Sequence, residues 1–322
     1  MNFRSVADLN DAVVRGLHRL PGDIDLVVGI PRSGMLAANL IALHLNLPLT
    51  DLDGYLEGRV MRSGQRGRDG VTGRHALVVD DSALSGATMQ ASRARIDEAS
   101  PSGRVTMTAV YIAPEARAAV DHAFEEIVGP RVFEWNLMHG GMIGRSCVDI
   151  DGVLCVDPTP QENDDGPRYR RFLEEVPPLL VPTTPVGWLV TCRLEKYRDL
   201  TQQWLDRHGV RYGELHMMDL PTKAARLASG SHGSFKAKVY ASTDALLFIE
   251  SSQRQAVEIA RLSGRPVLCI DSRRMVYPSM AAHAPQIIRH LPSFTRTLAR
   301  RLRRHLLGVD PPRTAKRKHL QT

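Results

Sequence analysis

Two adjacent carboxylates stand beside a short turn of small and hydroxyl-bearing residues in the first third of the chain. Asp80 and Asp81 end the apolar run HALVVDD. The turn that follows contains Ser85, Gly86, Ala87 and Thr88. Carboxylates accept hydrogen bonds from vicinal hydroxyls and suit a hard cation such as magnesium. Because free amides at a helix N-terminus favour an anion, the stretch predicts a sugar-phosphate site, with the diol on the acids and the phosphate on the turn.

A second pair of acids follows in CVDIDGVLC, residues 147–155. Asp149 and Asp151 are two positions apart at the end of an apolar run, and Gly152 turns the chain. In such a pair one carboxylate can attack a phosphoryl group while its neighbour protonates the leaving oxygen. Magnesium (Mg²⁺) would offset the negative charges. This spacing therefore predicts a site for phosphoryl transfer.

The elements that must position the first acids alternate along the first 130 residues. Strands are predicted at 25–30, 48–52, 75–81, 104–113 and 125–129. Helices are predicted at 33–46, 85–99 and 114–123, besides an amphipathic helix at the N-terminus. This alternation favours right-handed crossovers and a parallel sheet, which binds ligands beyond the carboxyl ends of its strands. The segment GIPRSG, residues 29–34, and the Asp80 segment both lie at such ends.

A second alternating unit follows a glycine-rich break near 137–145. It contains the acids at 146–155, strands at 186–193, 245–252 and 266–271, and helices at 195–209 and 253–264. Between the acids and the next strand, residues 155–185 are predicted to form a small insert with one short helix near 166–176. The predicted fold class is therefore α/β, with two doubly wound parallel-sheet domains at 1–138 and 144–278 and a basic helical tail at 285–322.

The first motif resembles the phosphoribosyl pyrophosphate (PRPP) motif of type I phosphoribosyltransferases, and the resemblance extends over residues 20–130. It implies that Asp80 and Asp81 bind the ribose hydroxyls. It implies a 5-phosphate site at Ser85, Gly86, Ala87 and Thr88. It also implies that the leaving pyrophosphate, with magnesium, lies on Arg32, Ser33 and Gly34. The Gly- and Arg-rich segment 53–73, predicted to be a long loop, resembles the flexible hood of this family.

The chain departs from the family at one position. Many purine-salvage members carry an acid two residues before the loop glycine, and this chain has Leu84 there. A base for the transfer must then come from elsewhere, with Asp53 and Glu57 as candidates. The departure argues against salvage of a nucleobase.

The second motif resembles the first motif of the haloacid dehalogenase superfamily of phosphatases, over about residues 144–275. The resemblance implies Asp149 as the nucleophile, Asp151 as the general acid and base, and Thr191 as a phosphate ligand. It requires a lysine, for which Lys236 is preferred over Lys223 and Lys238. It implies magnesium ligands at Asp149, Asp151 and Glu250. A fold of this kind that has lost catalysis is the alternative.

Composition limits the class of protein. The chain is 43% hydrophobic and 24% charged, as in ordinary globular proteins. It has neither a membrane-length apolar run nor a secretory signal. Its four cysteines show no metal-binding spacing and are expected to be buried thiols. A cytoplasmic protein is therefore predicted.

The C-terminal tail is strongly basic. Its leucines recur every four residues among arginines, so residues 285–322 are predicted to form a basic amphipathic helix. Such a helix can lie on the anionic inner face of the cell membrane or pack on the protein body, and both alternatives stay open. RNA binding is disfavoured because no aromatic platform accompanies the charge, so no nucleic-acid partner is expected.

Together, the motifs predict a bifunctional magnesium-dependent enzyme. It would transfer 5-phosphoribofuranose from PRPP to a saccharide acceptor, release pyrophosphate, and then hydrolyse the 5-phosphate. This pairing resembles ribofuranosyltransferase and phosphatase modules of bacterial polysaccharide biosynthesis, whose acceptors are lipid-linked. The alternatives are a phosphoribosyltransferase fused to a nucleotidase in nucleotide metabolism, and a regulator that senses PRPP.

Overall fold

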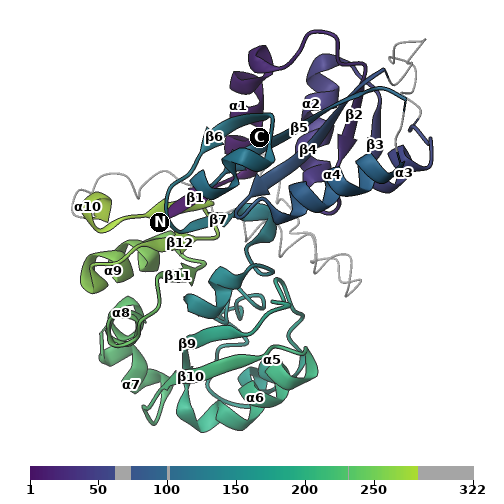
Figure 1. The fold of residues 1–322 in the computed structure, drawn as a ribbon. Coiled ribbons are helices and arrows are strands. Elements are labelled where there is room, and N and C mark those ends of the chain that lie inside the picture. Colours follow the sequence, from purple (N-terminus) through teal and green to yellow (C-terminus); the bar gives the residue numbers. More distant parts are fainter. Residues whose placement is uncertain (62–73, 100–101, 231, 282–322) are drawn as a thin grey trace, which may run out of the picture. The chain divides into compact units, whose positions relative to one another are not determined.

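The computed structural model describes residues 1–61, 74–99, 102–230 and 232–281. The tail at 285–322 and most of the predicted hood loop therefore lie outside the described residues. The chain divides into two compact units between Met142 and Ile143 (Figure 1). No helix in the described part of the chain is long and apolar enough to cross a membrane.

The first unit is built on a five-stranded parallel sheet with the strand order β3-β2-β4-β5-β6. These strands are β2 (Leu26–Gly29), β3 (Leu49–Asp51), β4 (His75–Ala83), β5 (Arg104–Ile112) and β6 (His122–Glu126). A separate parallel pair joins β1 (Asn2–Arg4) to β7 (Arg131–Phe133). The helices are α1 (Val6–Gly16), α2 (Gly34–Leu45), α3 (Leu52–Leu56) and α4 (Ala87–Ala99).

Alternation along the strands gives this sheet two apolar faces. Val27, Leu77 and Val79 point to the face that α1 and α2 cover. Their neighbours Val28 and Val78 point to the other face, where they pack with residues of α4. Because successive side chains of a strand point to opposite faces, a parallel strand buried on both sides has a continuous apolar sequence.

Several predicted elements of the first unit differ from the structure. Strand β4 continues two residues past Asp81, so it ends slightly later than the predicted strand at 75–81. Part of the predicted loop 53–73 is helical, as α3. The predicted helix at 114–123 is a short 3-10 turn, Pro114–Ala119, because β6 already begins at His122.

The second unit contains a six-stranded sheet with the strand order β10-β9-β8-β11-β12-β13. These strands are β8 (Ser146–Val148), β9 (Val186–Leu194), β10 (Tyr212–Met218), β11 (Leu247–Glu250), β12 (Val267–Cys269) and β13 (Arg274–Val276). All neighbouring pairs are parallel except β12 and β13. The predicted α/β class with parallel sheets is thus confirmed, with one antiparallel edge strand added.

The helices of the second unit include several that the sequence did not predict. They are α5 (Pro167–Glu175), α6 (Arg198–Arg207), α7 (Lys223–Ala228), α8 (His232–Ser242), α9 (Gln253–Ser263) and α10 (Pro278–Ala281). Helices α8 and α9 pack with β8, β9, β11 and β12 around a core that contains Tyr240, Phe248 and Ile259. In the insert, α5 lies within the predicted range and packs on α6. All four cysteines are buried and free.

Candidate functional site

Asp80 and Asp81 are both buried near the carboxyl end of β4. The Asp81 backbone N–H donates to Asp80 Oδ1 at 2.9 Å. Burial and the neighbouring charge of Asp81 raise the pKa of Asp80 to about 8. Near neutral pH, Asp80 therefore holds a proton that it can donate to an acceptor oxygen or release when a cationic group approaches.

A tryptophan from the end of the first unit contacts this acid pair. Trp135 Nε1 donates to Asp81 Oδ2 at 2.7 Å. Its ring stacks on Phe133 with centroids 5.0 Å apart. The next residue, Asn136, accepts a hydrogen bond from Arg32 Nη2 at 2.5 Å. One short segment thus contacts both Asp81 and Arg32 of the predicted pyrophosphate loop, and no local sequence pattern indicates this.

The turn after β4 forms a small pocket of about 210 Å³. Its lining residues are Ser82, Ala83, Leu84, Ser85, Gly86, Ala87, Thr88, Met89 and Arg131. Gly86 has a φ of +79°, a conformation that glycine adopts without strain. All four turn residues that are predicted to bind a phosphate therefore line this pocket.

Arg131 brings a positive charge to this pocket from β7. Its Nη1 atom is buried and has no hydrogen-bond partner among the described residues. Burial lowers the pKa of the guanidinium, while Asp81 and Glu115 oppose that effect. A buried donor without a partner costs free energy, so this atom is suited to an anionic ligand. The sequence analysis missed Arg131, which lies more than forty residues beyond the turn.

Gly34 sets the distance between the predicted pyrophosphate loop and the acid pair. A Cβ atom at this position would lie 2.8 Å from the Val79 carbonyl oxygen and 2.9 Å from Asp80 Oδ1. Only glycine fits this close approach. The structure therefore brings Arg32, Ser33 and Gly34 next to Asp80, as ligand binding across the strand ends requires.

The residues considered as a base are engaged elsewhere. Asp53 forms an exposed ion pair with Arg95 at 2.6 Å, and Glu57 forms one with Arg59 at 2.6 Å. Leu84 is 66% exposed, in the position where many purine-salvage enzymes carry an acid. No carboxylate replaces it among the residues that line the pocket of the turn.

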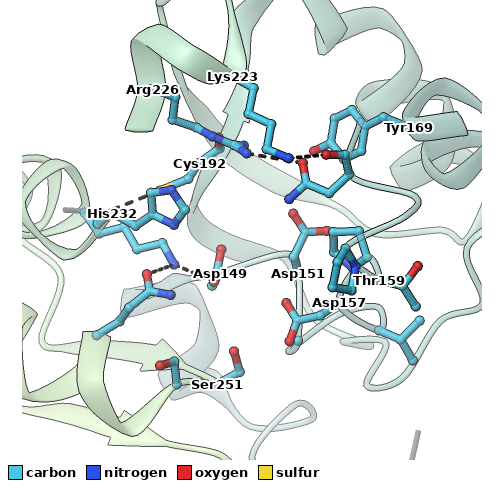
Figure 2. A pocket seen from close by; sticks show the side chains of 18 of the residues that line it. Asp149, Asp151, Asp157, Thr159, Tyr169, Cys192, Lys223, Arg226, His232 and Ser251 are labelled. Carbon is cyan, nitrogen blue, oxygen red and sulfur yellow. Dashed lines mark hydrogen bonds and ion pairs between the residues drawn. The ribbon is translucent and has the colours of Figure 1, made fainter. Parts of the chain in front are cut away.

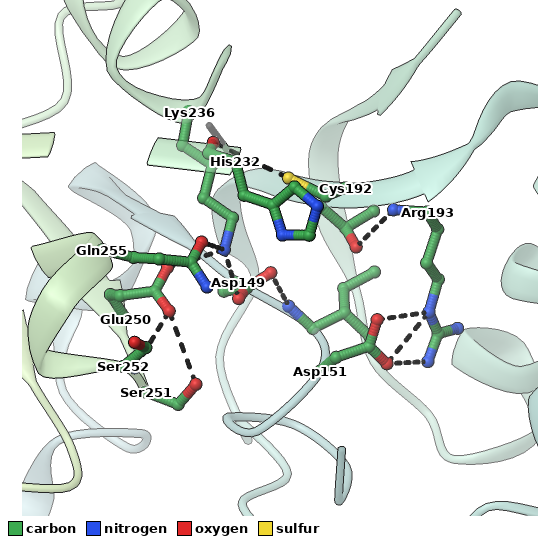
Figure 3. Close-up of polar contacts among 12 residues, drawn as sticks. Asp149, Asp151, Cys192, Arg193, His232, Lys236, Glu250, Ser251, Ser252 and Gln255 are labelled. Carbon is green, nitrogen blue, oxygen red and sulfur yellow. Dashed lines mark hydrogen bonds and ion pairs between the residues drawn. The ribbon is translucent and has the colours of Figure 1, made fainter. Parts of the chain in front are cut away.

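The second site is centred on a buried lysine. Lys236 Nζ donates to Asp149 Oδ2 at 2.6 Å, to Glu250 Oε2 at 2.7 Å and to Gln255 Oε1 at 3.0 Å (Figure 3). Burial raises the pKa of Asp149, and the Lys236 ammonium opposes this rise. Burial also disfavours the charged lysine, but the two carboxylates outweigh it and hold the pKa of Lys236 above its ordinary value.

Asp151 turns away from this lysine towards Arg193. The guanidinium of Arg193 is fully buried, and its Nη2 donates to Asp151 Oδ1 at 2.7 Å (Figure 3). Its Nε lies 3.2 Å from both carboxylate oxygens. This two-pronged pair fixes the Asp151 side chain at the edge of the site. Arg193, two residues beyond Thr191, was not identified in the sequence.

The predicted magnesium ligands do not converge. Asp149 and Glu250 meet on Lys236, whereas Asp151 faces Arg193. Glu250 Oε1 also accepts the Ser252 N–H at 3.0 Å, so both of its oxygens are engaged. Within the described ranges, no group of three or more His, Cys, Asp or Glu side chains could hold a metal ion. The side chains as they stand therefore do not fit the predicted three-carboxylate magnesium site.

Thr191 also differs from its predicted place. It is fully buried in β9 and is not among the residues that line the pocket above Asp149. Its Oγ1 accepts the Arg193 N–H at 3.2 Å. In this arrangement Thr191 helps to fix the backbone that carries Arg193, whereas the neighbouring Cys192 lines the pocket.

Asp149, Asp151 and Lys236 line a pocket of about 830 Å³ (Figure 2). Several side chains of the insert at 155–185 line this pocket, including Asp157, Thr159 and Tyr169. Burial, followed by the charges of Asp151 and Glu250, raises the pKa of Asp157 to about 6. Asp157 therefore adds a third acid near the pair, which the sequence analysis did not single out.

The first unit is a parallel α/β sheet in which the acid pair and the turn that follows it lie near the carboxyl end of β4. Residues 4–142 match the phosphoribosyl transferase domain family. This match spans nearly all of the first unit and none of the second.

Solved structures are similar to part of the chain. A purine phosphoribosyltransferase from Pyrococcus horikoshii Ot3 has 15% sequence identity and a TM-score of 0.32, covering 42% of this chain and 92% of its own. An orotate phosphoribosyltransferase from Aeropyrum pernix has 20% identity and a TM-score of 0.28, covering 37% and 69%. No curated protein matches this chain.

Proposed function

We propose that the chain is a bifunctional enzyme that transfers 5-phosphoribose from PRPP to an acceptor hydroxyl and then removes the 5-phosphate. The observation that carries the proposal is that one chain has two candidate sites near strand ends, one in each unit. One contains Arg131 beside the phosphate turn, and the other contains Lys236 beside Asp149. A phosphatase in the same chain would make the overall transfer irreversible.

In the transfer, the turn residues and Arg131 would bind the 5-phosphate, and Asp80 and Asp81 would bind the ribose hydroxyls. The bond between ribose C1 and the diphosphate oxygen breaks, and the acceptor oxygen forms a new bond to C1. The acceptor proton leaves to the diphosphate or to solvent. Magnesium would supply positive charge for the departing diphosphate, and Asp80 and Asp81 are the residues that would hold it.

In the hydrolysis, Asp149 would attack the phosphorus of the 5-phosphate while the ester oxygen leaves. Lys236 places its ammonium 2.6 Å from the attacking carboxylate and would offset the charge of the phosphoryl group. Asp151, held by Arg193, would deliver a proton to the leaving oxygen and later take one from the water that releases phosphate. This assignment agrees with the resemblance of residues 144–275 to haloacid dehalogenase phosphatases.

We infer a saccharide as the acceptor, because no acid replaces Leu84 to serve a nucleobase. A lipid-linked saccharide would also give the basic tail a role at the membrane surface. One observation favours the second candidate, a nucleobase acceptor with a nucleotidase step. Trp135, which contacts Asp81, provides an aromatic ring on which a base could stack.

Two variants separate the steps. With PRPP and a saccharide acceptor, Asp149→Asn is expected to accumulate the phosphoribosylated acceptor, whereas Asp80→Asn combined with Asp81→Asn prevents any transfer. Mass spectrometry distinguishes the products by the mass of one phosphate. If the protein releases pyrophosphate with nucleobases but not with any of the saccharides, the second candidate replaces the first.

A further inference from the structure

The pocket above Asp149 has a cationic wall that the proposed hydrolysis does not use. Lys223 and Arg226, both from α7, line the same pocket as Asp149 and Lys236. Figure 2 shows Lys223 and Arg226 on the side of the pocket opposite Ser251, with Asp149 and Asp151 between. The two cations are therefore placed to meet a part of the substrate other than the phosphate under attack.

Arg226 is buried without a counter-charge. Its side chain is only 6% exposed, and in the described part of the chain it forms no ion pair. Its Nη1 donates to the Cys192 carbonyl oxygen at 3.0 Å and its Nη2 to Asn163 Oδ1 at 3.4 Å. Its Nε atom is buried and has no partner among the described residues. Burying an unpaired guanidinium is costly, so an anion from outside the chain is the natural partner.

Lys223 is half-buried and, among the described residues, forms no ion pair either. Its ammonium donates to the Asn163 carbonyl oxygen, which is neutral. The acid that accepts the Lys223 backbone N–H, Asp165, pairs through its other oxygen with Lys196 at 3.0 Å. Asp165 therefore already has a cationic partner, and the wall keeps an excess of positive charge.

The pocket is large enough to contact a second group of the substrate besides the phosphate under attack. Ligand pockets range from about 300 to 1,000 Å³, and this one lies near the upper end at about 830 Å³. A phosphate at Asp149 and Lys236 would fill only a part of that volume. The remainder extends to the wall of Lys223 and Arg226.

We propose that Lys223 and Arg226 form a second oxyanion subsite, which binds another phosphoryl group of the same substrate. A guanidinium recognises phosphate oxygens through its planar fork, and an ammonium adds a point charge. This inference rests on the proposed phosphatase function and narrows its substrate to molecules that carry two phosphoryl groups. An acceptor with its own phosphate or diphosphate would satisfy it.

The test compares substrates that differ only in the second phosphate. The probes are alkanediol bisphosphates with three to eight carbons and alkanol monophosphates of the same lengths, hydrolysed by the full chain. At one or more lengths we expect the bisphosphate to have a KM about ten- to hundredfold lower, the worth of one charge-assisted contact. Lys223→Met and Arg226→Gln should remove this advantage and leave kcat and KM for the monophosphates unchanged.

Lys238→Met is the matched control, because Lys238 is exposed on α8 and does not line the pocket. Arg226→Lys, which keeps the charge, should retain part of the advantage if Arg226→Gln is poorly folded. If the monophosphates are hydrolysed and the bisphosphate has no lower KM at any length, the subsite is overturned while the phosphatase proposal is kept. Failure to hydrolyse any probe overturns the phosphatase and the subsite together. If the bisphosphate keeps its lower KM in both Lys223→Met and Arg226→Gln, the second phosphate binds elsewhere and the inference is also overturned.

Discussion

At the scale of single residues, Lys236 has the largest electrostatic role in the second unit. Its ammonium contacts two buried carboxylates, Asp149 and Glu250, and is itself only 2% exposed. Without it, two acids would remain together in an apolar environment. The removal of one partner from a buried charge cluster destabilises a protein by roughly 3–5 kcal/mol. Lys236 therefore offsets the charge of two buried acids, and in the proposed hydrolysis it would keep Asp149 able to attack phosphorus.

We expect Lys236→Met to abolish phosphate release. Burial already raises the pKa of Asp149, and loss of the neighbouring ammonium removes the charge that opposes this rise. The protonated acid cannot attack phosphorus, so phosphatase activity should fall by about two orders of magnitude or more. Phosphate release is measured at neutral pH, with circular dichroism to verify the fold and Lys238→Met as the control. Near-normal release by a folded Lys236→Met protein would contradict this role.

The sequence could identify residues whose role follows from local spacing. Asp80, Asp81, Asp149 and Asp151 stand in short motifs, and the structure places each of them at a strand end. Arg131, Trp135 and Arg193 could not be found in this way. Their partners lie tens of residues away, and only the parallel sheet brings them together. The choice among Lys223, Lys236 and Lys238 depended equally on the fold, because only Lys236 contacts Asp149.

At the scale of elements, the first site depends on contact between one loop and one strand. Helix α2 begins at Gly34, which lies against the Val79–Asp80 backbone of β4. This contact places the predicted pyrophosphate loop beside the acid pair. No side chain can be added there without separating the two elements.

We expect Gly34→Ala to weaken PRPP binding strongly while the second unit stays active. The new methyl group would lie within 3 Å of the Val79 carbonyl oxygen and of Asp80, so the loop must move. Gly22→Ala is the matched control, because a Cβ atom at Gly22 meets nothing within 4 Å. Calorimetric titration with PRPP measures the affinity. Unchanged PRPP affinity in Gly34→Ala would mean that the two elements need not be in contact.

Elements with a continuous apolar sequence were predictable, and those with mixed patterns were not. The strands β2, β4 and β11 were found because parallel strands buried on both faces contain little polar sequence. Helix α7 was missed because a charged residue, Arg226, interrupts its buried face. The ends of elements were shifted where a strand continued through a polar residue, as β4 does through Ser82.

At the scale of the whole molecule, the chain consists of two units with separate apolar cores. The core residues of the first unit end at Phe133, and those of the α8 and α9 core begin at Cys147. Each unit has its own sheet, with no strand shared between them. The two activities that we propose therefore have separate structural supports.

We expect thermal unfolding to show two transitions that respond to different ligands. PRPP at about one hundred times its dissociation constant stabilises the state that binds it by about 2.7 kcal/mol, so it should raise one transition by several degrees. The variant Asp80→Asn plus Asp81→Asn should lose this shift, and Asp149→Asn should keep it. Differential scanning calorimetry measures both transitions. A single transition that moves as a whole with PRPP would show that the units unfold as one.

The distribution of sulfur in the chain gives the second unit a chemical marker of its own. Every cysteine lies at or beyond position 147, and all four thiols are buried and unbridged. Burial raises the pKa of Cys147 to about 12, which suppresses the reactive thiolate while the unit is closed. Alkylating reagents added to the intact protein would thus label only molecules whose second unit has opened. Their rate of incorporation would time that opening without interference from the PRPP-binding half.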